Sequence, residues 1–141
     1  MSPKICLRIA SLSLFFILLG HSTTFIQPVT HGEPEIQVFQ AMKNFTFDMM
    51  GSMRSHHDFY IGYSVMMTIH LAMIGIILWI LSNRTPQNLR ELNGIMIALT
   101  VGTALYAGIC WTNFFIAPAA PATLAAISIA LAAALSRKVE A

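Results

Sequence analysis

Long runs of apolar residues, separated by short polar segments, dominate the pattern along the chain. Four runs stand out, at about residues 9–26, 59–81, 92–111 and 118–135. A helix needs roughly 20 apolar residues to cross a hydrocarbon core about 30 Å thick, and lipid admits only helices or closed barrels. The runs are much longer than strands and turn signals are sparse, so we expect no strands. The pattern predicts an all-α fold, a four-helix transmembrane bundle forming one domain over residues 1–141.

The first run has two interpretations. Lys4 and Arg8 precede it, and small residues follow at Gly20 and Ser22, which also fits a secretory signal peptide. Against cleavage, the apolar character resumes at Phe25 and no clean Ala-x-Ala site is present. We favour a retained first helix, and a cleaved signal peptide is the alternative.

Composition agrees with a membrane protein. Hydrophobic residues make up 56% of the chain and charged residues 10%, whereas soluble domains carry about 25% charged residues. An ordinary soluble enzyme, a disordered tail and a nucleic-acid-binding domain are excluded, so the expected partner is the lipid bilayer. Short inner loops of membrane proteins are rich in Lys and Arg, which predicts that both termini are cytoplasmic. The inner side then carries Lys4, Arg8, Arg84, Arg90, Arg137 and Lys138, and the outer side Lys43 and Arg54.

One long connection, residues 27–58, joins the first two runs on the outer side. Pro34 is typical of a first helical turn, and apolar residues after it recur at helical spacing. We expect a short amphipathic helix over residues 35–44, lying on the membrane surface or capping the bundle. Gly51-Ser52 is interpreted as a hinge, and the inner connection 82–90 as a plain polar turn.

Polar side chains within the runs are functional candidates, because an unpartnered polar group in lipid costs free energy. With a rise of about 1.5 Å per residue, His21 lies at the depth of Ser64 and Tyr106, and His70 lies near the midplane. The second run also carries a helical stripe, made of His56, Tyr60, Tyr63, Met67 and His70. The functional interpretation is an outward-facing groove between helices, and the alternative is that these groups only satisfy one another.

At the start of the second run, Arg54 and Asp58 are four residues apart and would face each other on a helix. They form either a helix-start salt bridge or a site in which Arg54 orients an anionic ligand. The complete set of tentative ligand-binding residues is His21, Arg54, Asp58, Tyr60, Tyr63, His70 and Tyr106.

Known catalytic motifs are missing from the sequence, so no catalytic residue is assigned. The histidines and methionines lack the spacing of a metal site, and we expect no metal and no cofactor, with a quinone as a weaker alternative. Gly94, Ala98 and Gly102 form a small-xxx-small face on the third run, which we expect to pack against the alanine-rich fourth run. A homodimer through this face is the minority alternative.

Several of these segments resemble an uncharacterised family of small bacterial four-span membrane proteins. The resemblance rests on Gly20-His21, Ala41-Met42, Arg54-Ser55 and Asp58-Phe59-Tyr60-x-Gly62-Tyr63. It implies a retained first span and a shared pattern at the outer mouth, made of His21, Arg54, Asp58, Tyr60 and Gly62, but no catalytic residue. We expect the protein to lie in the bacterial inner membrane. The architecture is also similar to the DoxX-like four-helix membrane proteins, some of which are linked to quinone redox chemistry, and this is an analogy of fold alone.

Three functions remain in competition. The first is a binding or redox-accessory protein that holds a quinone or lipid in the outward-facing groove. The second is a structural or accessory membrane subunit without a ligand. The third is a small membrane enzyme for a lipophilic substrate, with His21 or Asp58 as general base.

Overall fold

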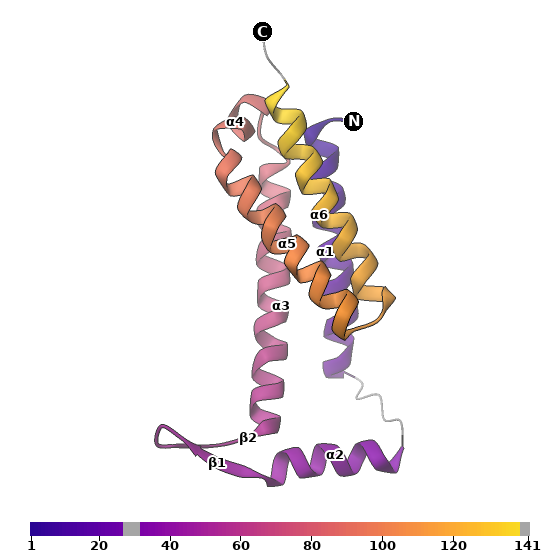
Figure 1. Cartoon of the computed structure of the whole chain (residues 1–141), viewed down its shortest axis with the longest axis vertical. Helices are drawn as coiled ribbons and strands as arrows, with labels where there is room; N and C mark the ends of the chain where they lie inside the picture. The colour runs from indigo at the N-terminus through magenta and orange to yellow at the C-terminus, as the bar shows by residue number, and fades with distance from the viewer. Residues whose placement is uncertain (27–31, 139–141) are drawn as a thin grey trace. The chain divides into compact units, whose positions relative to one another are not determined.

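The computed structural model describes residues 1–26 and 32–138, so residues 27–31 of the predicted outer loop and 139–141 lie outside the described part. Within these described residues, four helices are long and apolar enough to cross a membrane, which confirms that the four predicted apolar runs are helices; Figure 1 shows them. They are α1 (Pro3–Ile26), α3 (His56–Leu81), α5 (Asn93–Asn113) and α6 (Ile116–Arg137). Each begins or ends beyond its apolar run, because polar residues can continue a helix outside the hydrocarbon core.

Two compact units make up the structure. The first unit contains residues 1–20 and the chain from residue 71 onward, and the second unit contains residues 21–70. The first unit therefore holds most of α1, the end of α3, and all of α5 and α6. The second unit holds the segment between α1 and α3 together with the first half of α3.

In the first unit, α1 packs against the end of α3 through a glycine. The buried Ser11 hydroxyl donates a hydrogen bond of 2.7 Å to the Gly75 carbonyl oxygen. A Cβ at Gly75 would lie 3.1 Å from the Phe15 ring, so any larger residue here requires the ring to shift by a few tenths of an ångström or more. Near the same end of α3, the Arg8 guanidinium lies 5.0 Å from the centre of the Trp79 ring, a favourable cation–π contact.

The last two spans form the predicted antiparallel pair, joined by hydrogen bonds at both ends. Trp111 Nε1 donates to Thr123 Oγ1 over 2.9 Å, and Arg137 Nε donates to Asn93 Oδ1 over 2.9 Å. The buried face of α6 is mostly alanine, and includes Ala119, Ala122, Ala125, Ala126, Ala132 and Ala133.

The expectation that Gly94, Ala98 and Gly102 face α6 is wrong. All three are exposed, and nothing lies within 4 Å of a Cβ built at Gly94 or Gly102. The buried face of α5 instead carries larger side chains, among them Met96 and Cys110. Because the buried side chains of α6 are mostly small, larger side chains of α5 fill the space between the two helices.

The connection between α3 and α5 contains a short helix, α4 (Pro86–Glu91), and is not the plain polar turn expected from the sequence. Thr85 caps it, since its hydroxyl accepts a hydrogen bond from the Asn88 backbone amide over 3.3 Å. Pro86 occupies the first turn, where a missing N–H costs nothing. Leu89 is buried on the bundle side of this helix, and such burial stabilises a helix too short to form alone.

The second unit contains two strands, which corrects the prediction that the chain has none. Strands β1 (Thr46–Met49) and β2 (Ser52–Ser55) are antiparallel. The two-residue turn between them has positive φ at Met50 (55°) and Gly51 (84°), which suits the twist of a hairpin. Asp48 Oδ1 accepts the Gly51 N–H over 2.9 Å, so Gly51 belongs to a hairpin turn and not to a hinge.

Helix α2 (Glu33–Asn44) precedes the hairpin, where the sequence predicts a helix over residues 35–44. Its Phe39 ring meets the rings of His57 and Tyr60 edge-on, at centroid distances of 6.4 and 5.9 Å. Within the second unit, α2 and the hairpin run across the axis of α3 at its start (Figure 1). This arrangement places several aromatic side chains around the first turns of α3.

Candidate functional site

The hairpin presents one face to the start of α3. Its register pairs Phe47 with Arg54 and Met49 with Ser52. Directly opposed residues of an antiparallel pair point to the same side, and alternate pairs share a side. All four side chains therefore belong to one face of the hairpin, which brings a guanidinium beside apolar groups.

Ser55 and Asp58 form a capping box that starts α3. Asp58 Oδ2 accepts hydrogen bonds from the Ser55 backbone N–H (2.8 Å) and hydroxyl (2.9 Å), and the Ser55 hydroxyl accepts the Asp58 backbone N–H (3.2 Å). Such reciprocal bonds satisfy amides that a helix start leaves unpaired. The carboxylate of Asp58 is thereby held in place at the junction between strand and helix.

The predicted helical pairing of Arg54 with Asp58 is not formed. Arg54 lies in β2, before α3 begins, so the spacing of four does not act as a helical spacing. Its Nη1 donates to the Met53 carbonyl oxygen over 3.1 Å. Within the described residues the two side chains make no ion pair, although the Arg54 charge lies close enough to act on the Asp58 carboxylate.

Stacked aromatic rings fix the hairpin on α3. Phe47 lies parallel to Phe59, with an interplanar angle of 3° and a centroid distance of 5.9 Å. Phe45 stacks on His56 at 5.6 Å, and Phe59 contacts Tyr63 at 6.3 Å. Offset aromatic pairs contribute about 0.5–1.5 kcal/mol each beyond the area that they bury. The hairpin face and the first turns of α3 are thus held against each other.

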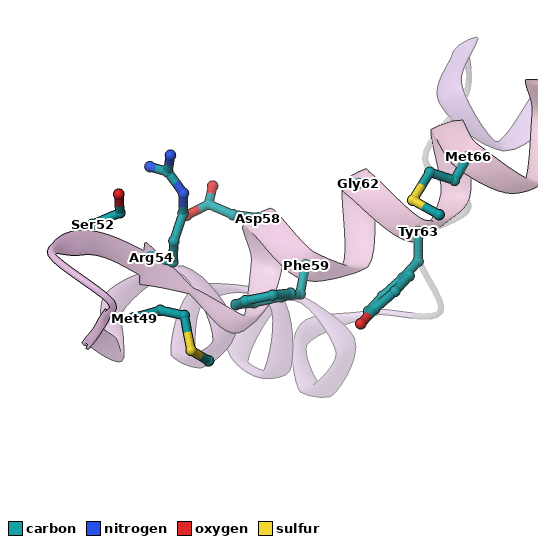
Figure 2. Close-up of a pocket in the computed structure, with 8 residues that line it drawn as sticks. All are labelled: Met49, Ser52, Arg54, Asp58, Phe59, Gly62, Tyr63 and Met66. Atoms are coloured by element: carbon teal, nitrogen blue, oxygen red, sulfur yellow. The ribbon is translucent and has the colours of Figure 1, made fainter.

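A hollow of about 460 Å³ lies between this hairpin face and α3. This volume falls in the usual range of ligand pockets, about 300–1,000 Å³. Figure 2 shows Arg54 and Asp58 toward the hairpin and Met66 farther along α3. The described residues that line the hollow are Met49, Ser52, Arg54, Asp58, Phe59, Gly62, Tyr63 and Met66.

The α3 wall of the hollow is one helix face. Phe59, Gly62, Tyr63 and Met66 follow spacings of three, one and three, which place them together on the helix surface. Nothing lies within 4 Å of a Cβ built at Gly62, so the glycine opens the floor between the larger side chains. The hollow is therefore charged at the hairpin end and apolar along α3.

Three of the seven predicted site residues line this hollow, namely Arg54, Asp58 and Tyr63. Tyr60 packs against Phe39 of α2 instead. His21 belongs to the same unit, and its Nε2 lies 3.2 Å from the Ser64 carbonyl oxygen. His21 and Ser64 are the residues that the sequence placed at the same depth. Neither of them lines the hollow.

The two remaining candidates lie elsewhere. His70 is exposed, and its Nδ1 lies 2.7 Å from the Met66 carbonyl oxygen of its own helix. Tyr106 belongs to the first unit, where it lies on α5. Of the predicted stripe on α3, Tyr63 lines this hollow, together with residues of a neighbouring face of the same helix.

Five lining residues were not among the predicted site residues: Met49, Ser52, Phe59, Gly62 and Met66. The dipeptide Met50-Gly51 after Thr46-Phe47-Asp48-Met49 was a weak signal for the hairpin, because Gly at the second turn position suits a two-residue loop. The spacing of Phe59, Gly62, Tyr63 and Met66 was a second signal, but every face of an apolar span offers comparable spacings.

Metal ligands do not gather in the described ranges 1–26 and 32–138, where no group of three or more His, Cys, Asp or Glu side chains could hold an ion. Cys6 and Cys110 are buried free thiols. The described lining of the hollow offers one guanidinium, one carboxylate, hydroxyls and apolar surface.

Comparison with known proteins leaves the chain without a match: no protein-family model, no curated protein and no solved structure is significantly similar to it.

Proposed function

We propose that this chain is a multi-pass protein of the bacterial inner membrane that binds a lipophilic molecule in the hollow between the β-hairpin and α3. Four apolar helices support the membrane assignment. The orientation follows from charge, because cytoplasmic termini leave six basic residues inside and Lys43 and Arg54 outside. The hollow then lies at the outer end of α3.

The observation that carries the proposal is the make-up of the hollow. Its volume of about 460 Å³ is bounded by aromatic and methionine side chains, with one cation at its hairpin end. Ligand sites commonly combine apolar walls with a few polar groups that fix orientation. Because α3 continues directly from this wall into an apolar span, a molecule dissolved in the bilayer reaches the hollow without crossing water.

Between the two candidate ligands, the lining favours a lipid over a quinone. The histidines expected to hydrogen-bond a quinone carbonyl, His21 and His70, do not line the hollow. His21 contacts Ser64, and His70 contacts the carbonyl of Met66. A charged end beside an apolar wall matches an amphiphile better than a neutral ring.

The direct test is to fill the floor of the hollow. Gly62→Leu adds a side chain where the structure leaves open space, and Gly108→Leu is the matched control, since it is also an exposed glycine inside an apolar helix with nothing within 4 Å. Native mass spectrometry of gently extracted protein measures the bound lipophile. We expect Gly62→Leu to lose most of it and the control to keep it. Equal content in the two variants would refute the proposal.

A structural subunit without a ligand is the second candidate. Many polar side chains in the spans are satisfied by their own helices, as when Thr68 donates to the Ser64 carbonyl and Thr100 to the Met96 carbonyl. The exposed small-residue face of α5 is where we would place a second copy in a homodimer. This candidate requires that wild-type protein carry no bound lipophile after gentle extraction.

A further inference from the structure

We propose that the hollow recognises a zwitterionic phospholipid whose head carries a phosphate and a primary ammonium. This inference rests on the proposed function, which requires only that some lipophilic molecule occupies the hollow. It adds the chemistry of the head and the direction of one acyl chain. The argument uses the two charges of the hollow and the shape of its α3 wall.

The first step is charge complementarity. Among the described lining residues, Arg54 is the sole cation and Asp58 the sole carboxylate. Arg54 forms no ion pair within the described part of the chain, and its side chain donates there only to the Met53 backbone oxygen. A guanidinium binds phosphate oxygens through paired, charge-assisted hydrogen bonds. Arg54 therefore offers a phosphate site at the hairpin end of the hollow.

The second step is the neighbouring carboxylate. The capping bonds from Ser55 go to Oδ2 of Asp58, and these bonds orient the side chain while Oδ1 stays open to an added donor. A purely anionic head would meet repulsion from this carboxylate. A head with both signs places its phosphate on Arg54 and its ammonium on Asp58, so the opposite charges of protein and lipid match one by one.

The third step is the path of the acyl chain. Asp58 and Met66 are eight residues apart on α3, which is about 12 Å at the rise of a helix. Phe59 and Tyr63 flank the open position at Gly62 along this path. An acyl chain laid over Gly62 runs parallel to α3, which is the direction that lipid chains take beside a spanning helix. Head and tail then follow the order of charged and apolar residues seen in Figure 2.

The experiment adds three lipids to the full-length protein in detergent micelles and follows each by native mass spectrometry. The probes are phosphatidylethanolamine, phosphatidylglycerol and phosphatidylcholine with identical acyl chains. We expect phosphatidylethanolamine to bind about tenfold more tightly than either other lipid, because a charged hydrogen bond lost in such a site is worth roughly one order of magnitude. Phosphatidylglycerol lacks the ammonium, and the quaternary ammonium of phosphatidylcholine donates no hydrogen bond.

Two variants assign the head to its partners. Asp58→Asn keeps an oxygen for the capping bonds and removes the charge, so it should abolish the preference for phosphatidylethanolamine while phosphatidylglycerol binding does not fall. Arg54→Gln should weaken all three lipids about tenfold. Asp48→Asn and Lys43→Gln are matched controls, because neither residue lines the hollow, and both should bind as wild type.

The outcomes separate this inference from the proposed function. Equal affinity of wild-type protein for the three lipids overturns the head-group assignment and needs no variant, so a folding defect cannot obscure it. If Gly62→Leu still loses the lipid in that case, the hollow remains a lipid site without head-group selection. If Gly62→Leu binds all three lipids as wild type does, the proposed function fails together with the inference.

Discussion

The contact between α1 and α3 at Gly75 allows a quantitative test of the packing in the first unit. A Cβ at Gly75 would lie 3.1–3.4 Å from three carbon atoms of the Phe15 ring. Gly75→Leu adds this carbon and three more, so the two helices must separate or the ring must leave its position. Separation would also stretch the buried hydrogen bond from Ser11 to the Gly75 carbonyl.

Three terms set the expected size of the effect. Overpacking of a close-packed interior costs typically 1–3 kcal/mol. Loss of an interhelical hydrogen bond in a membrane protein costs about 0.6 kcal/mol. Replacing glycine by leucine in a helix returns up to about 1 kcal/mol of propensity. We therefore expect Gly75→Leu to lower the free energy of unfolding by about 2 kcal/mol.

The assay is reversible unfolding in mixed detergent micelles, followed by far-ultraviolet circular dichroism. Gly108→Leu is the control, because it gains the same propensity at a glycine with nothing within 4 Å. It should be as stable as wild type or up to about 1 kcal/mol more stable. If the two variants unfold at the same denaturant concentration, α1 does not pack on α3 through Gly75 and this reasoning is refuted.

Three further predictions concern α1, the capping box and the orientation. Because Ser11 of α1 packs on α3, we expect α1 to be retained, and the intact mass of C-terminally tagged protein purified from membranes checks it; a mass short by the first 20–25 residues contradicts it. Asp58→Ala should cost about 1 kcal/mol of stability, while Asp58→Asn costs much less because it preserves the acceptor; equal midpoints in thermal unfolding would argue against the capping role. Met50→Cys, at a fully exposed position, should react with an impermeant maleimide on intact spheroplasts, and Arg84→Cys only after lysis; the reverse pattern would invert the proposed orientation. Cys6 and Cys110 are buried and should keep the background of this labelling low.

The existence and approximate extent of the four spans could be predicted from the sequence, because the cost of placing a residue in lipid depends mainly on its own side chain and on the length of the run. The antiparallel pairing of α5 with α6 also followed, since the connection between them is short. Short elements were harder. Helix α4 depends on the burial of Leu89 against the rest of its unit, and the hairpin turn places Met50, a residue with a side chain, at positive φ. Neither condition can be recognised in a local pattern.

Which faces of the spans meet was decided by the tertiary structure alone. Every face of such a helix is apolar, so hydropathy does not distinguish the buried side from the lipid side. Gly94 and Gly102 looked like a packing face and are exposed, whereas Gly75 attracted no notice and lies directly against the Phe15 ring of α1. Likewise, the sequence by itself marked Arg54, Asp58 and Tyr63 as a polar group at the start of a span. Only the tertiary structure places these three residues around one hollow. The hairpin is held against the first turns of α3 by the bonds between Ser55 and Asp58 and by the stacking of Phe47 on Phe59, and such contacts between separate elements cannot be read from a single residue type.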